Sequence, residues 1–260
     1  MGESNDLGEL PERGELTERG ERSRTLQPAG GAHQPWGVVF DLDGTLVDSS
    51  VDITRAINRM LRDHRLPGLD PAQVEPLLGE GARSLVSSVY DILGVPVSAE
   101  RLSRDTARYL EHYAEEPVHD SVLYRDARPA LAELSAHGVR LGICTNKNEG
   151  LAVRVLTELG VDHFFSTVVG GDSLAVRKPE PEHLLVTVRN LEVPAAQTLF
   201  VGDSRIDAEC ARRADVRCLL VDWGVPDPDC ARIERFGDLV QHLGPAGGEQ
   251  LPAPTAKDPR

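Results

Sequence analysis

Short apolar runs alternate along the chain with segments whose apolar residues recur every three or four positions. The runs predict strands buried on both faces, and the segments predict helices with one buried face. In 127–138, for example, Leu131 and Leu134 lie three positions apart and Gly138 supplies a stop. Strands that alternate with helices indicate a parallel sheet with helices on both faces. The predicted strands are 38–40, 139–144, 167–169, 199–201 and 218–221.

One long interval lacks any strand-like run. Between Ser50 and His119 the pattern is helical, with apolar residues at three- and four-residue spacing. A helical insert directly after the first strand would form a small bundle above the strand ends. We therefore predict an α/β fold, with a Rossmann-like parallel sheet core and an inserted α-helical cap domain. The predicted core comprises residues 35–49 and 119–243, and the predicted cap comprises residues 50–118.

The two ends of the chain differ in composition from the rest. The first 34 residues contain a charged, Gly-rich repeat, GELPER followed by GELTER and GER, and few apolar side chains. Such a segment buries too little surface to offset its ordering entropy, so we predict a disordered acidic tail rather than a partner-binding segment. The Pro- and Gly-rich residues 244–260 predict a second disordered tail.

Charge and cysteine content narrow the classes of function. The formal net charge of −14 argues against a nucleic-acid or anionic-membrane partner. The four cysteines have no metal-ligand spacing, which favours free thiols in a reducing compartment. The chain has no apolar run long enough for a membrane span and no apolar signal segment, so we predict a cytoplasmic protein. Its oligomeric state, monomer or homodimer, stays open.

Polar clusters follow four of the predicted strands: DLDGT, TNK, GGD and GDSRID. Because ligands of parallel sheets bind beyond the carboxyl ends of the strands, we expect these clusters to converge. Asp41, Asp43, Asp203 and Asp207 would then bring several negative charges close together, which is costly without a cation. Oxygen ligands without cysteine or histidine favour Mg²⁺ over zinc.

The cations are distributed unevenly. Of 28 basic residues only three are lysines, and one of these, Lys178, stands in the motif RKPEP. A compact ammonium there suits the neutralisation of a phosphoryl oxygen, although a surface lysine before a loop proline is an equally simple explanation. Thr145 and Asn146 precede a predicted helix, where a hydroxyl and backbone N–H groups suit phosphate oxygens.

Together, DLDGT, the strand-terminal threonine, the Lys-Pro pair and GDSRID resemble the haloacid dehalogenase superfamily of phosphohydrolases. The motifs occur in the family's order over about residues 36–225, and the helical insert resembles the family's α-helical cap. Within the superfamily, DLDGTLVDS, TNK and VVGGDSLAVRKPEP most resemble the phosphoglycolate phosphatases. Two departures are Asn148, where relatives often carry proline, and Asp215, where an Ala-Gly pair is usual; Asp215 leaves the conformation of its turn uncertain.

The resemblance implies roles for individual residues. Asp41 would be the nucleophile that forms an aspartyl-phosphate, and Asp43 the general acid and then base. Asp41, the backbone carbonyl of Asp43 and Asp203 would hold Mg²⁺, while Asp207 would support the ion through water or orient Lys178. Thr145, Asn146 and Lys178 would bind the phosphoryl oxygens.

Two further residues have less specific expectations. We expect Asp48 to cap the first cap helix. Arg83, in the loop GEGAR between two predicted cap helices, would pair with a substrate carboxylate such as that of glycolate, unless it lies on a solvated helix face. The sequence therefore predicts a Mg²⁺-dependent hydrolase of a small phosphomonoester, with 2-phosphoglycolate as the first candidate.

Several alternatives belong to the same superfamily. A phosphosugar phosphatase, a pyrophosphatase and a phosphosugar mutase all stay open. A dehalogenase would not need Asp43, and a phosphonatase would need a cap lysine, which residues 50–119 lack. A non-enzymatic scaffold is disfavoured because every predicted catalytic residue is present.

Overall fold

The computed structural model describes residues 36–243. The predicted tails, residues 1–34 and 244–260, lie outside the described residues. Within the described range, no helix is both long enough and apolar enough to cross a membrane. All four cysteines fall in this range and are free, as predicted.

The core within residues 36–243 is a six-stranded parallel sheet with the spatial order β5-β4-β1-β6-β7-β8. β1 (Gly37–Phe40) lies between β4 (Arg140–Cys144) and β6 (Thr198–Gly202). Every residue of β1 and β6 is buried, which explains why apolar runs predicted both strands. The remaining strands of this sheet are β5 (Phe165–Val169), β7 (Arg217–Val221) and β8 (Ala231–Ile233).

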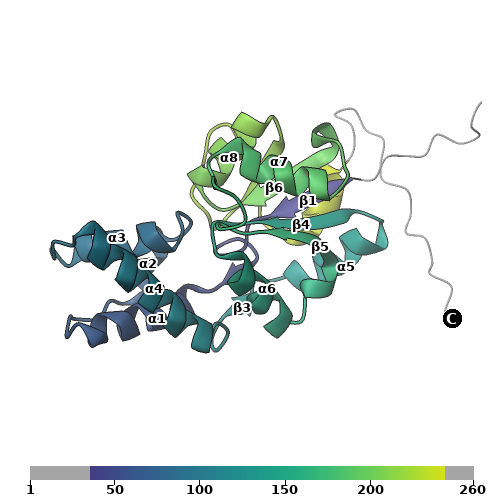
Figure 1. Ribbon diagram of the computed structural model, residues 1–260. Coiled ribbons are helices and arrows are strands. Elements are labelled where there is room, and N and C mark those ends of the chain that lie inside the picture. Colours follow the sequence, from purple (N-terminus) through teal and green to yellow (C-terminus); the bar gives the residue numbers. More distant parts are fainter. Residues whose placement is uncertain (1–35, 244–260) are drawn as a thin grey trace, which may run out of the picture. The chain divides into compact units, whose positions relative to one another are not determined.

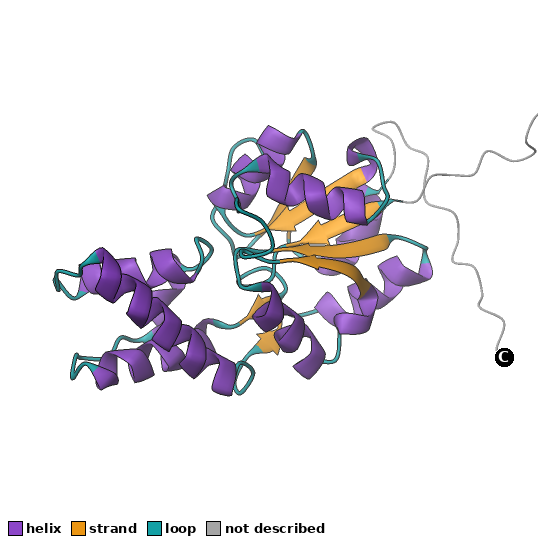
Figure 2. Ribbon diagram, viewed as in Figure 1, coloured by secondary structure: helices purple, strands orange, loops and turns teal. Residues whose placement is uncertain are grey.

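Helices cover both faces of this sheet, so the predicted α/β fold is confirmed (Figure 2). On one face, α5 (Ala127–Ala136), α6 (Glu149–Glu158) and the 3₁₀ segment η4 (Phe236–His242) pack against β1 and β4. On the other face, α7 (Pro181–Asn190) and α8 (Arg205–Ala214) pack against β1 and β6. Short 3₁₀ turns, η2 (Asp162–Phe164) and η3 (Ala195–Gln197), precede β5 and β6.

The residues between β2 and β3 contain helices and no strand over the range 50–115 (Figure 1). Their buried apolar side chains form a hydrophobic cluster of their own, separate from the two clusters at the sheet. α1 packs against α4, and α4 packs against α3. The separate cluster is consistent with the predicted cap, whose boundaries stay predictions. The cap helices are α1 (Ser50–Asp63), α2 (Pro71–Val74) with the 3₁₀ turn η1 (Glu75–Leu77), α3 (Ala82–Ile92) and α4 (Ala99–Glu115).

A short antiparallel ribbon connects the cap helices to the sheet. β2 (Val47–Asp48) pairs with β3 (Val122–Leu123), on the two chain segments that lead into and out of the cap. The Asp52 carboxylate, in the first turn of α1, accepts hydrogen bonds from the backbone N–H groups of 119–121 and from the Ser121 hydroxyl. These bonds join the start of the cap to its end.

The prediction that Asp48 caps α1 is wrong. Asp48 belongs to β2, and the N-cap position falls on Ser49. Neither makes a side-chain capping bond: Asp48 accepts from the Ser50 hydroxyl, and the Ser49 hydroxyl donates to Asp43 at 2.6 Å. Strand pairing places Asp48 one residue too early, a constraint that the local sequence does not show.

Candidate active site

Three neighbouring strands end at the proposed site. Asp41 follows β1, Thr145 follows β4, and Asp203 follows β6, and these strands are adjacent in the sheet. The Asp41 N–H donates to the Val201 carbonyl at 2.9 Å, which continues the strand pairing by one residue. The predicted clusters therefore meet at the carboxyl edge of the sheet, as expected for a parallel α/β fold.

Asp41 lies beside Lys178 in the protein interior. The Lys178 ammonium is 2.9 Å from Asp41 Oδ1 and 2.7 Å from Asp207 Oδ1. The side chains of all three residues are at most 4% exposed, so the alternative of a surface lysine does not hold. The buried cation therefore faces two buried carboxylates.

Burial and charge shift the pKa values of this cluster. Burial raises the pKa of Asp41 from 3.8 to about 6, with Lys178 opposing this effect and Asp207 adding to it. Burial, together with Asp207 and Asp41, holds the pKa of Asp203 well above its usual range. Burial alone would lower the pKa of Lys178, but the carboxylates of Asp207 and Asp41 outweigh it and raise that pKa well above 10.5. The lysine therefore stays charged, while Asp41 and Asp203 carry excess negative charge that a cation would relieve.

Carboxylate oxygens of Asp41, Asp203 and Asp207 lie within 4.8 Å of one another. Asp41 Oδ1 is buried and its partner is the Lys178 ammonium at 2.9 Å, and Asp203 Oδ1 accepts a hydrogen bond from the Thr45 hydroxyl at 2.7 Å. Three carboxyl groups this close together supply oxygen donors only, and such a group fits a hard divalent cation. The Asp43 carboxylate is not part of this group, so its predicted metal contact through the backbone carbonyl stays a prediction.

Asp207 is held in place by its own helix. Its Oδ2 accepts from the Ser204 hydroxyl at 2.6 Å and from the backbone N–H groups of Ser204 and Asp203, at the start of α8. Its Oδ1 contacts Lys178. Both oxygens are thus engaged by the protein, which favours the orientation of Lys178 over direct metal ligation as the role of Asp207.

The loop after β4 contacts both the sheet and the cap helices. The Thr145 N–H donates to the Val169 carbonyl at 3.0 Å, and the Thr145 hydroxyl accepts from the Lys147 N–H at 3.3 Å. The Asn146 amide donates to the carbonyls of Gly79, in the GEGAR loop, and of Lys178. Because the side-chain nitrogen of Asn146 has these two acceptors, a phosphate contact of Asn146 would come from its backbone N–H.

The GGD cluster has a structural role that sequence reasoning did not identify. The Asp172 carboxylate accepts from the Glu149 N–H at 2.8 Å and from the Asn148 side-chain amide at 2.9 Å, and so caps α6. A side chain at Gly171 would place its Cβ 2.3 Å from the Asn146 carbonyl oxygen. The cluster therefore packs closely beneath the loop 145–148 and fixes its position.

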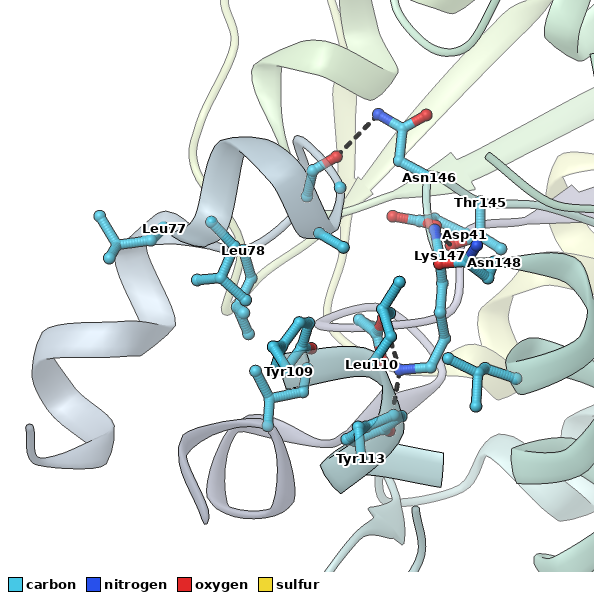
Figure 3. Close-up of a pocket in the computed structure, with 17 residues that line it drawn as sticks. Asp41, Leu77, Leu78, Tyr109, Leu110, Tyr113, Thr145, Asn146, Lys147 and Asn148 are labelled. Atoms are coloured by element: carbon cyan, nitrogen blue, oxygen red, sulfur yellow. Dashed lines mark hydrogen bonds and ion pairs between the residues drawn. The ribbon is translucent and has the colours of Figure 1, made fainter. Parts of the chain in front are cut away.

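Lys147 extends from the loop after β4 toward Tyr113 (Figure 3), and the sequence did not reveal its contacts. The Lys147 ammonium is 2.9 and 3.0 Å from the two carboxylate oxygens of Asp43 and 2.8 Å from the Tyr113 hydroxyl on α4. It also lies 4.2 Å from the centroid of the Tyr113 ring. The sequence feature that could have indicated Lys147 is the scarcity of lysine, since it is one of three lysines in the chain. Only Lys178 was singled out on this basis.

A pocket opens between these loops and the cap helices (Figure 3). The sheet side contributes Asp41, Asp43 and the loop 145–148, and the cap side contributes apolar side chains of α3, α4 and η1 together with Gly79 and Gly81. The part of a small ligand that points away from Asp41 and Asp43 would thus be surrounded mainly by apolar side chains.

The structure does not bring Arg83 into this pocket. α3 begins at Ala82, and the Arg83 guanidinium donates to the Ser103 hydroxyl of α4 at 2.7 Å. Ala82 and Leu85 line the pocket, whereas Arg83 does not. The predicted contact between Arg83 and a substrate carboxylate is therefore not supported by this geometry.

Comparisons with known proteins agree with this arrangement. The chain is 38% identical over 234 residues to a phosphoglycolate phosphatase of Rhodospirillum rubrum, covering 85% of this chain and 97% of that protein. It is 35% identical to a phosphoglycolate phosphatase of Yersinia pestis, covering 80% and 93%. A crystal structure of a predicted phosphoglycolate phosphatase from Haemophilus somnus superposes with a TM-score of 0.74 at 30% identity, covering 82% and 99%.

A family-wide comparison covers most of the described chain. Residues 38–221 match the family described as haloacid dehalogenase-like hydrolase. The match begins at the strand that precedes Asp41 and extends to the end of β7, so it contains every catalytic, phosphate and metal position predicted from the motifs. The chain therefore belongs to the haloacid dehalogenase-like hydrolases, and the hydrolytic enzyme expected from its motifs is confirmed.

Proposed function

We propose that this protein is a phosphatase that hydrolyses 2-phosphoglycolate through an aspartyl-phosphate on Asp41. The observation that carries the proposal is the pair of Asp41, against the buried ammonium of Lys178, and Asp43 two residues later, both lining one pocket. The names of the similar proteins from Rhodospirillum rubrum and Yersinia pestis support the choice of substrate.

In the first half-reaction, a carboxylate oxygen of Asp41 attacks the phosphorus atom, and the bond from phosphorus to the ester oxygen breaks. The electron pair of that bond goes to the leaving alkoxide, which takes a proton from Asp43. The Lys178 ammonium and the Thr145 hydroxyl hold the phosphoryl oxygens as charge shifts onto them.

In the second half-reaction, Asp43 removes a proton from a water molecule, and the water oxygen attacks the phosphorus atom of the aspartyl-phosphate. The bond between phosphorus and Asp41 breaks, which releases phosphate and restores the carboxylate. The contacts of Asp43 with Ser49 and Lys147 hold its carboxylate in one place for both proton transfers.

The residues that would hold Mg²⁺ are Asp41, Asp203 and the backbone carbonyl of Asp43, with Asp207 acting through Lys178. The closeness of the Asp41, Asp203 and Asp207 carboxyl groups and the oxygen-only donors support this choice of metal. When bound, the ion would offset the negative charge of the carboxylates and of the phosphoryl group. The cytoplasmic location, and the choice between monomer and homodimer, stay predictions from the sequence.

The proposal is tested by phosphate release from a panel of phosphate esters, with Mg²⁺ and with EDTA. The panel contains 2-phosphoglycolate, sugar phosphates, nucleotides and pyrophosphate. We expect Mg²⁺-dependent turnover with 2-phosphoglycolate preferred, and at least about 10³-fold slower turnover in Asp41→Asn, which keeps the shape of the side chain and removes the nucleophile. Release from another ester at a higher kcat/KM would reject the substrate, and substantial activity of folded Asp41→Asn would reject the covalent mechanism.

A further inference from the structure

Lys147 places a positive charge in the pocket beside the proposed general acid. Its ammonium contacts both carboxylate oxygens of Asp43 and the Tyr113 hydroxyl, and its side chain is 6% exposed. A cation–π interaction with the Tyr113 ring gives the ammonium an additional favourable contact. The charge is therefore held at a defined point between the loop 145–148 and α4.

Among the described residues that line this pocket, Lys147 carries the only positive charge. Lys178, which contacts Asp41 and Asp207, is not among the lining residues, and neither is Arg83. The residues between α1 and α4 contribute mainly apolar side chains to this pocket, among them Leu77, Leu85 and Leu110. An anionic group on the organic part of a substrate would thus find a compensating charge at Lys147.

The chemistry of the reaction fixes where that organic part lies. To protonate the leaving alkoxide, Asp43 must come within about 2.6–3.2 Å of the ester oxygen. In 2-phosphoglycolate, the carbon that bears this oxygen also bears the carboxylate. A carboxylate so close to Asp43 lies within reach of the ammonium that already touches Asp43.

We propose that Lys147 binds the carboxylate of the leaving group and so selects phosphate esters of 2-hydroxy acids over neutral phosphate esters. This inference rests on the proposed function and deepens it. In the substrate-free protein, the Asp43 carboxylate accepts the hydrogen bonds that the substrate carboxylate would share. A charge-assisted bond of this type discriminates strongly, because a neutral analogue leaves the ammonium with one partner fewer.

A purely structural role of Lys147 would have a different effect on the rates of hydrolysis. If Lys147 only held Asp43 and α4 in place, its removal would slow the hydrolysis of every substrate by a similar factor. Carboxylate recognition instead predicts a loss that depends on the substrate. The matched pair of substrates is 2-phosphoglycolate and its amide, phosphoglycolamide, which has nearly the same shape and lacks the negative charge.

The experiment measures kcat and KM for both substrates with the wild-type protein, Lys147→Met and Arg83→Met in Mg²⁺. We expect the wild type to prefer 2-phosphoglycolate over the amide by about 10- to 100-fold in kcat/KM, since hydrogen bonds to charged groups contribute about 1.5–3 kcal/mol. The preference should fall to about threefold or less in Lys147→Met, mainly through KM, and should persist in Arg83→Met.

Two outcomes would overturn the proposal: a preference that survives in Lys147→Met because both substrates lose kcat/KM equally, or a preference that is lost in Arg83→Met instead. Inhibition of the wild type by glycolate and glycolamide gives a measurement that does not depend on a folded variant. Glycolate should bind at least about 10-fold more tightly, and equal inhibition would also overturn the proposal. Failure of the proposed function is a separate result, because the wild type would then prefer an ester outside this pair.

Discussion

Replacement of Lys178 by methionine removes a buried charge while keeping a straight side chain of similar length. In the wild type the ammonium lies 2.9 Å from Asp41 and 2.7 Å from Asp207, and these side chains are 4% and 0% exposed. Lys178→Met would leave both carboxylates in the interior without their cation. Asp203 adds a third negative charge to the same region.

The magnitude follows from the burial of the pair. Removal of one partner from a buried ion pair costs about 3–5 kcal/mol, because the remaining charge is left uncompensated. Two carboxylates share Lys178 here, but protonation of one of them limits the cost. We therefore expect Lys178→Met to lower the free energy of unfolding by about 3–5 kcal/mol at neutral pH in EDTA.

The assay is equilibrium unfolding in urea, followed by circular dichroism, with EDTA and with Mg²⁺. Mg²⁺ would take over part of the neutralisation, and at one hundred times its dissociation constant it stabilises the folded state by about 2.7 kcal/mol. Arg189→Met is a matched control, because Arg189 pairs with Glu182 on the surface, where both side chains are more than half exposed. Its loss should be at most about 1 kcal/mol.

A loss below about 1 kcal/mol for Lys178→Met in EDTA would refute the reasoning, since it would mean that the carboxylates need no buried cation. The double variant Lys178→Met with Asp207→Asn gives an independent check. Replacing one orphaned carboxylate by an amide should recover part of the lost stability, so the two changes together should cost less than their sum. Additive losses would contradict the pairing seen in the structure.

Two further predictions concern stability. The first compares the free energy of unfolding of the wild type with that of Asp41→Asn in EDTA. Burial raises the pKa of folded Asp41 to about 6, so the folded wild type takes up a proton as the pH falls from about 6 toward 3.8, and its free energy of unfolding should rise relative to that of Asp41→Asn. A difference that does not change with pH would contradict this sign. Asp52→Asn should cost about 1–3 kcal/mol at neutral pH, because an amide cannot replace a carboxylate that accepts from three backbone N–H groups and the Ser121 hydroxyl. Burial alone would raise the pKa of Asp52, but these hydrogen bonds lower that pKa below 3.8. The loss of stability in Asp52→Asn should therefore become smaller in acid, where the wild-type carboxylate is protonated. A loss of stability that does not depend on pH would argue against these bonds.

The central strands could be predicted because burial on both faces leaves a simple apolar pattern. β1 and β6 have no exposed residue; β1 begins one residue before its predicted run, and β6 extends one residue beyond its predicted run at each end. β8 could not be predicted, because it lies at the sheet edge and only Ile233 of its three residues is buried. The ribbon β2–β3 was missed for another reason: two-residue strands have no period, and their pairing joins positions about 75 residues apart.

The turn after α8 has a left-handed residue that is not glycine. Asp215, where the family resemblance predicts a glycine after Ala214, adopts the left-handed conformation with φ 52°. Aspartate tolerates this region better than most residues, because its short polar side chain bonds to the local backbone. Asp215 therefore ends α8 in a conformation that glycine adopts most easily.

The site residues also divide into those whose position the sequence predicted and those whose position it did not. Asp41, Thr145 and Asp203 follow central strands, so the rule that strand ends converge was enough to bring them together. The contacts of Arg83 depended on the helix register of α3, which directs its guanidinium to Ser103. A difference of one residue in the start of that helix changes which side chain faces the pocket, and element boundaries are the least certain part of a prediction from sequence.

Lys147 shows why the sequence alone left the pocket incomplete. Its partners Asp43 and Tyr113 are 104 and 34 positions away, and no motif joins the three residues. Only the fold brings α4 next to the loop after β4, at the point where Asn146 also donates to the Gly79 carbonyl. The loop that would bind the phosphoryl group therefore contacts the cap helices through two consecutive residues. Any shift of those helices relative to the sheet must break or stretch these bonds, so the position of the cap helices and the contacts around Asp43 depend on each other.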